Sequence, residues 1–243
     1  MAQSFNAAEL VADDKKYVWH HLTQHKIFEK SDPTIFVKGK GMRVWDVNGK
    51  EYLDAVSGGV WTVNLGYANE VLAKAVGDQL MELCYFANGF GNIPTIRFSK
   101  KLIEKMPGMS RVYLSNSGSE ANEKAFKIVR QISQLKHNGK KGKILFRNRD
   151  YHGTTITTLS ACGQEERKMQ YGPYTPGFVE FPACSVYRSP YPAGTANLGE
   201  KFAQEMEKVI QKEDPDTVGA VIVEPITAGG GVIVPPDGYY ETM

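Results

Sequence analysis

The segment Tyr113–Arg130, YLSNSGSEANEKAFKIVR, sets Ser117-Gly118-Ser119 between a short apolar run and an amphipathic helical pattern. Free backbone N–H groups and the helix dipole favour an anion at such a helix start, and serine hydroxyls add donors. Gly118 lets a ligand approach the backbone closely. The motif is equally typical of a plain helix cap, with Ser117 or Ser119 as the cap and Glu120 in the first turn. Because no P-loop lysine follows, an anchored phosphate fits better than a nucleotide triphosphate.

A second candidate segment is RDYHGTT, residues 149–155, which follows the next apolar run. In a parallel α/β sheet, ligands bind at the carboxyl ends of the strands. Tyr151 and His152 offer aromatic surfaces for a flat ring, and Gly153 lets the backbone turn. An ordinary turn with one core aromatic side chain explains the same residues, so both interpretations stay open here.

Glu224 is the third candidate, because it ends the almost wholly apolar run VGAVIVEP just before a proline. A carboxylate beside a buried strand is costly unless it has a partner. It could accept from a buried polar group or orient a ring substituent of a cofactor. The alternative is a strand-end side chain that faces solvent.

The elements that must position these residues alternate between strand and helix. We predict strands at 111–115 and 143–146 and in the apolar run 218–225, and helices at 70–83, 94–106, 120–135 and 198–211, with a short helix after Gly153. Before them, a weak helical pattern covers 7–25, and Asn48-Gly49 predicts a hairpin between strands at 42–47 and 51–54. The alternation predicts a doubly wound α/β domain with a parallel sheet.

Composition narrows the class of protein. The chain of 243 residues has a formal net charge of +2 and 42% hydrophobic residues, as expected of a globular protein that binds neither nucleic acid nor membrane through its charge. Its cysteines, Cys84, Cys162 and Cys184, suggest neither a metal site nor a disulfide framework, so we expect a reducing, cytoplasmic location.

The motifs SNSGSEANEKAFKIVR, YHGTT and EPITAGGGVIVPPDGYY, in this order, resemble the class III aminotransferases. These are enzymes of fold type I that depend on pyridoxal 5′-phosphate (PLP). The resemblance covers the whole chain. The segments KKYVWHHLTQHK, DAVSGGVWTVN, CYFANGFGN, LSACGQ and QYGP resemble the members of the family that use taurine as amino donor and pyruvate as acceptor.

The resemblance implies a role for each candidate. The anion would be the PLP phosphate, held by Gly118 and Ser119 backbone donors and a serine hydroxyl. Tyr151 would stack on the pyridine ring with His152 beside it, and Glu224 would help to position the ring. The substrate pocket would be lined by Trp61 and Leu22.

The resemblance also implies an organisation. Residues 1–65 would form an N-terminal arm and hairpin, part of a small domain, and residues 66–243 most of the large PLP-binding α/β domain. Family members are homodimers. Their Schiff-base lysine and the aspartate that pairs the pyridine nitrogen would lie beyond Met243. We therefore expect these 243 residues to be an N-terminal fragment that does not transaminate alone.

Two alternatives remain at this point. The protein could be another class III ω-amino acid:pyruvate aminotransferase, with β-alanine or 4-aminobutyrate as donor. It could instead be a PLP-binding fragment without catalytic activity. A sulfonate and a carboxylate are both anions, so the residues do not separate the donors.

Overall fold

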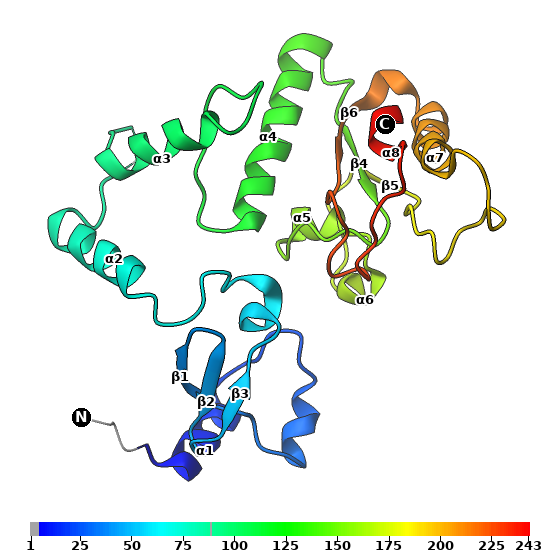
Figure 1. Ribbon diagram of the computed structural model, residues 1–243. Helices are drawn as coiled ribbons and strands as arrows, with labels where there is room; N and C mark the ends of the chain where they lie inside the picture. The colour runs from blue at the N-terminus through cyan, green and yellow to red at the C-terminus, as the bar shows by residue number, and fades with distance from the viewer. Residues whose placement is uncertain (1–4, 88) are drawn as a thin grey trace. The chain divides into compact units, whose positions relative to one another are not determined.

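The computed structural model describes residues 5–87 and 89–243, and it separates into two compact units, Met1–Arg97 and Phe98–Met243. The division falls within α3, Ile93–Ile103 (Figure 1). The predicted functional division after residue 65 stays a prediction. In the described residues, no helix combines the length and the apolar character needed to cross a bilayer.

The first unit is built on a three-stranded antiparallel sheet in the order β1-β2-β3. Its strands are β1 (Phe36–Lys40), β2 (Arg43–Asp46) and β3 (Glu51–Leu53). The predicted hairpin is confirmed: β2 and β3 pair around Asn48-Gly49, and Gly49 has a positive φ of 81°. The Asp46 carboxylate accepts from the N–H groups of Asn48 and Lys50, both at 2.9 Å, which fixes the turn. Strand β1 was not predicted.

Helices and turns complete this unit. The N-terminal helix α1 is shorter than predicted, Ala7–Tyr17, and a 3₁₀ turn at His25–Glu29 follows it. An irregular turn, η2, covers Ser57–Trp61, and α2 covers Glu70–Glu82, one residue short of the prediction.

The second unit contains a parallel sheet in the order β5-β4-β6. Its strands are β4 (Lys143–Arg147), β5 (Phe178–Phe181) and β6 (Val218–Ile222). Its longest helices are α4 (Gly118–His137) and α7 (Leu198–Lys212), and the shorter ones are α5 (Ile156–Ser160), α6 (Glu165–Lys168), η3 (Pro215–Thr217) and α8 (Tyr239–Thr242).

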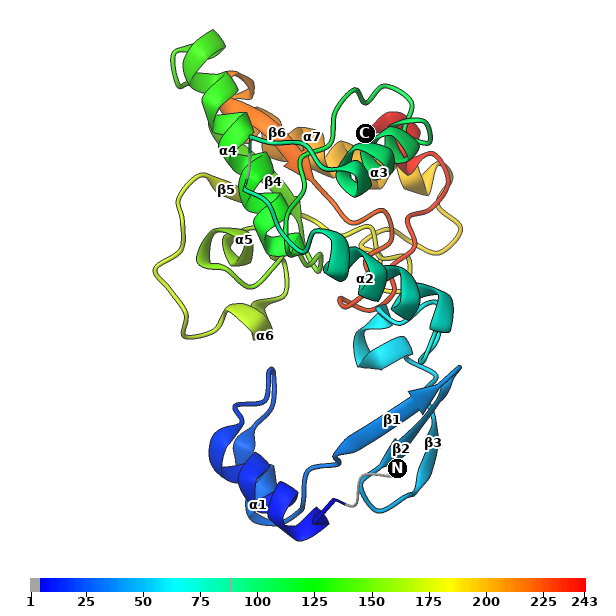
Figure 2. The ribbon, with the colours of Figure 1, turned by 90° about the vertical axis from the view of Figure 1, so that its left-hand side faces the viewer.

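Helices cover both faces of this sheet, as the predicted doubly wound architecture requires (Figure 1). On one face, Phe126 of α4 packs with Ile144 and Phe146 of β4. On the other face, Met206 of α7 packs with Leu145. Figure 2 shows α4 crossing β4 and β6. Alternate residues of β4 therefore point to opposite cores, which explains its continuous apolar sequence.

The predicted strand at Arg111–Ser115 is wrong. The segment has no regular secondary structure and pairs with no strand in the described part of the chain, and Tyr113 and Leu114 are exposed. A strand needs a neighbour for its backbone hydrogen bonds, and an apolar pattern alone does not supply one. Strand β5, which was not predicted, pairs in register along β4.

Candidate cofactor site

The amino end of α4 is capped and also keeps free donors. Ser117 Oγ accepts from the N–H of Glu120 at 3.2 Å, and the Glu120 carboxylate accepts from the N–H of Asn116 at 2.8 Å. Among the described residues, the N–H groups of Gly118 and Ser119 have no acceptor. A Cβ built on Gly118 would meet no atom within 4 Å apart from its chain neighbours and its own helix backbone, so the space on the Cβ side of Gly118 is open. The cap and the anion site are therefore compatible.

The loop after β4 lies directly against this helix end. Ser119 Oγ accepts from the N–H of Thr154 at 3.1 Å, and Asn122 donates to the carbonyl of His152 at 2.7 Å. Gly153 has a φ of 144°, and a Cβ there would lie 2.5 Å from Ser119 Oγ. The structure thus brings two of the predicted segments together, and glycine is required where they meet. Because Ser117 and Ser119 both accept through Oγ, each hydroxyl keeps its proton for a ligand.

The side chains of Tyr151 and His152 differ in environment. Tyr151 is half-buried, and the guanidinium of Arg167 lies 5.0 Å from its ring centroid. His152 is 6% exposed, and burial lowers its pKa to about 4, opposed by Asp150 and assisted by Arg147. Its Nε2 is buried and has no hydrogen-bond partner in the described residues. A neutral imidazole with a free ring nitrogen is a group that a ligand or water can satisfy.

Glu224 follows β6 by two residues, and its carboxylate binds backbone groups. Its two oxygens accept from the N–H of Tyr151 at 2.8 Å and from the N–H of Ala228 at 3.2 Å. Because the residue is half-buried and its carboxylate is paired, the structure favours the partnered interpretation over the solvent-facing one. Glu224 therefore ties the end of β6 to the loop that carries Tyr151.

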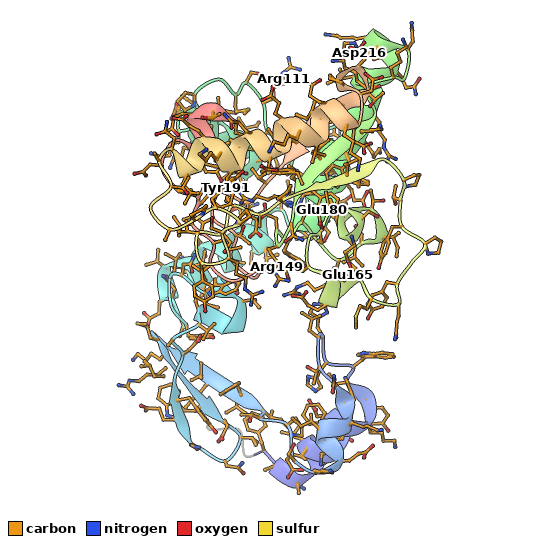
Figure 3. The ribbon with its side chains drawn as sticks, turned by 90° about the vertical axis from the view of Figure 1, so that its right-hand side faces the viewer. Arg111, Arg149, Glu165, Glu180, Tyr191 and Asp216 are labelled. Atoms are coloured by element: carbon orange, nitrogen blue, oxygen red, sulfur yellow. The ribbon has the colours of Figure 1, made fainter. Side chains whose placement is uncertain are left out.

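All six cofactor candidates lie in the Phe98–Met243 unit. The loops that follow β4 and β6 meet at one end of the sheet, as expected for parallel strands. In Figure 3, Arg149, which follows β4, and Asp216, which precedes β6, mark opposite ends of this sheet. The described residues contain no group of metal-binding side chains.

The two predicted substrate residues lie in the other unit. Trp61 ends the turn η2 with a φ of 61° and is 55% exposed, and Leu22 has a φ of 50° and is 66% exposed. Their contact with a substrate stays a prediction.

Sequence reasoning missed three residues beside Glu224. Arg147, Asp150 and Thr227 are all fully buried and bonded to one another. The available signal was a pair of opposite charges at the end of an apolar strand, with Arg147 as the last residue of β4 and Asp150 three residues later.

Comparison with known proteins identifies the family. Residues 27–243 match the family of class III aminotransferases. The chain belongs to the class III aminotransferases. This family depends on PLP, and the fold predicted from the resemblance is confirmed.

Members of the family with similar sequences have names that state their substrates. The chain is 70% identical over 240 residues to the taurine–pyruvate aminotransferase of Bilophila wadsworthia. The matched segment is 99% of this chain and 52% of that protein. It is 58% identical to the hypotaurine/taurine–pyruvate aminotransferase of Paracoccus denitrificans, over 97% of this chain and 51% of that protein. The chain spans about half the length of the curated relatives it matches.

Solved structures of class III transaminases have the same fold. An (S)-enantioselective ω-transaminase from Thermomicrobium roseum matches with a TM-score of 0.92 and 36% identity, over 99% of this chain and 54% of that one. An ω-transaminase from Pseudomonas jessenii in complex with PMP matches with a TM-score of 0.91 and 34% identity, over 96% of this chain and 52% of that one. The donors at α4 and the open space beside Gly118 fit the phosphate of such a cofactor.

Proposed function

We propose that this chain supplies the phosphate- and ring-binding part of a PLP-dependent enzyme that transfers the amino group of taurine to pyruvate, giving sulfoacetaldehyde and L-alanine. The observation that carries the cofactor assignment is the pair of free N–H groups at the amino end of α4, which lies against the loop of Tyr151 and His152. Glu224 ties this loop to the end of β6. The donor assignment is supported by the 70% identity to a taurine–pyruvate aminotransferase. The activity belongs to the full-length protein, since this chain spans about half of such relatives.

In this proposal, the amino end of α4 holds the phosphate. The N–H groups of Gly118 and Ser119 and the hydroxyls of Ser117 and Ser119 donate to it, and the helix dipole favours its charge. Since Gly118 has no side chain, the phosphate can approach the backbone.

The ring would be held by the other three residues. Tyr151 offers an aromatic face that stays in place because its backbone N–H is bonded to Glu224. His152 is neutral, so it adds no positive charge beside the ring. Bound PLP supplies the electron sink for moving an amino group. Within this chain, Glu224 acts by fixing the loop of Tyr151, and the covalent link to the cofactor is assigned to a lysine of the full-length protein.

The donor assignment is tested with the full-length protein. Alanine formation from pyruvate is measured with taurine, β-alanine and 4-aminobutyrate as donors. We expect kcat/KM for taurine to exceed that for each carboxylate donor by about tenfold or more, a difference of about 1.4 kcal/mol in transition-state binding. A higher kcat/KM for β-alanine or 4-aminobutyrate would assign another class III activity. PLP binding without alanine from any donor would contradict the aminotransferase assignment.

We also propose a homodimer in the cytoplasm. The dimer is supported by the family and by exposed aromatic side chains in the first unit, among them Tyr85, Phe86 and Phe90. The location is supported by the cysteines, because Cys84, Cys162 and Cys184 are free thiols and a reducing compartment keeps thiols in this state. Light scattering of the purified full-length protein tests the dimer, and a monomer mass would contradict it.

A further inference from the structure

We propose that Arg147, Asp150 and Thr227 form a buried clamp that positions Glu224, and through it Tyr151, for cofactor binding. The inference rests on the proposed function, because it assumes that Glu224 and Tyr151 lie beside the PLP ring. Arg147 and Asp150 bind the backbone of Glu224 and not its carboxylate, so the clamp is argued to act through the position of Glu224.

The clamp is completely withdrawn from water. Arg147, Asp150 and Thr227 each have a relative exposure of 0%. Arg147 Nη2 lies 3.2 Å from Asp150 Oδ1 and also donates to Thr227 Oγ1 at 3.2 Å. The Thr227 hydroxyl in turn donates to Asp150 Oδ1. Each charged or polar group is thus paired inside the cluster.

Both backbone groups of Glu224 are held by this cluster. Asp150 Oδ2 accepts from the N–H of Glu224 at 2.8 Å, and Arg147 donates to its carbonyl oxygen. The carbonyl also accepts from the hydroxyl of Tyr240 at 3.2 Å. The position of Glu224 is therefore fixed from the end of β4 as well as by its own strand.

The contacts close a ring between the two loops. Asp150 holds the backbone of Glu224, and the carboxylate of Glu224 holds the backbone of Tyr151, the residue after Asp150. A shift of Asp150 would move both loops together. A buried ion pair contributes little net stability compared with apolar packing, so a role in fixing geometry accounts better for a charged pair at this strand end.

The test uses Asp150→Asn in the full-length protein. Both carboxylate oxygens of Asp150 accept hydrogen bonds, so an amide must turn its NH₂ toward a donor on one side. We expect the Kd for PLP, measured by titrating the apoprotein and following absorbance, to rise by about tenfold or more. The matched control is Glu213→Gln, which makes the same change where Lys143 Nζ bonds Glu213 at 2.9 Å, at the amino end of β4. We expect its Kd to stay within about twofold of the wild type.

A double-mutant cycle separates positioning from a general loss of stability. If Asp150 acts through Glu224, the double variant D150N/E224Q binds PLP about as weakly as the weaker single variant. If the fold increases in the Kd of the two single variants multiply in the double variant, Asp150 does not act through Glu224 and the proposal is overturned. Wild-type protein that does not bind PLP would instead overturn the proposed function.

A milder pair of variants covers the case in which D150N does not fold. Thr227→Val removes the hydroxyl and keeps the shape, and Thr227→Ser restores the hydroxyl. We expect T227V to raise the Kd for PLP about threefold or more and T227S to return it toward the wild-type value. Equal PLP affinity in T227V and wild type would contradict the clamp.

Discussion

At the proposed cofactor site, burial and hydrogen bonds set what each single residue can contribute. The sequence allowed Ser117, Gly118, Tyr151 and Glu224 to be selected, because each follows or begins a predictable element. It did not reveal Asp150, because its importance comes from contacts with residues more than seventy positions away. The pair of opposite charges, Arg147 and Asp150, is visible in the sequence, but its burial depends on how distant segments pack, which the pair alone does not show.

The burial of His152 predicts a dependence of stability on pH. An unfolded histidine has a pKa near 6.5, whereas the pKa of folded His152 is about 4. Between these values the unfolded state binds more protons, so the free energy of unfolding is fully retained above pH 6.5 and falls as the pH drops toward 4. From pH 7.5 to pH 5, this residue contributes a loss of about 2 kcal/mol.

The measurement compares urea unfolding of wild-type and His152→Asn apoprotein at both pH values, with His137→Asn as an exposed control. We expect H152N to lose less stability than wild type over this range, and H137N to follow the wild type. The same pH dependence in wild type and H152N would show that His152 takes up its proton in the folded state.

Two glycines beside the proposed phosphate site should respond differently to an added methyl group. Gly153→Ala places a Cβ 2.3 Å from Thr158 Oγ1 at a φ of 144°, so we expect the apoprotein to lose about 1–3 kcal/mol of stability. Gly118→Ala meets no neighbouring atom, so we expect unchanged folding but weaker PLP binding, by about tenfold. Urea unfolding and PLP titration measure the two effects. Unchanged PLP affinity in G118A would exclude close approach of the phosphate at Gly118.

Among the helices and strands, periodicity and capping residues predicted most of the elements that border the proposed cofactor site. Helix α4 extends two residues beyond the predicted range 120–135 at each end, because Ser117 caps it and Asn138 ends it with a positive φ of 50°. The strands β4 and β6 were found from their apolar runs. The segment 111–115 has a similar apolar character but pairs with no strand in the described chain. Strand pairing depends on a neighbouring strand, and the local sequence pattern does not show whether one is present.

The cap of α4 can be tested apart from its ligand. Ser117→Ala removes the acceptor for the N–H of Glu120, so we expect the apoprotein to lose about 1 kcal/mol of stability in urea unfolding. Ser117→Thr keeps an acceptor and serves as the control. Equal stability of S117A and wild type would mean that water replaces the hydroxyl at no cost.

For the molecule as a whole, the two units differ in how many of their apolar side chains are buried. The second unit has core clusters on both faces of its sheet, whereas α2 of the first unit has no buried residue. The apolar side chains of α2, such as Val71, Val76 and Leu80, are exposed in the described chain. Amphipathic periodicity predicted this helix correctly, but it carries no information on what covers the apolar face.

In the proposed function, the amino end of α4 and the loops after β4 and β6 together hold PLP. The most direct measurement is a crystal structure of the full-length protein grown with PLP. We expect phosphate oxygens about 3 Å from the N–H groups of Gly118 and Ser119, with the ring beside Tyr151. A phosphate bound elsewhere, with these N–H groups facing only water, would contradict it.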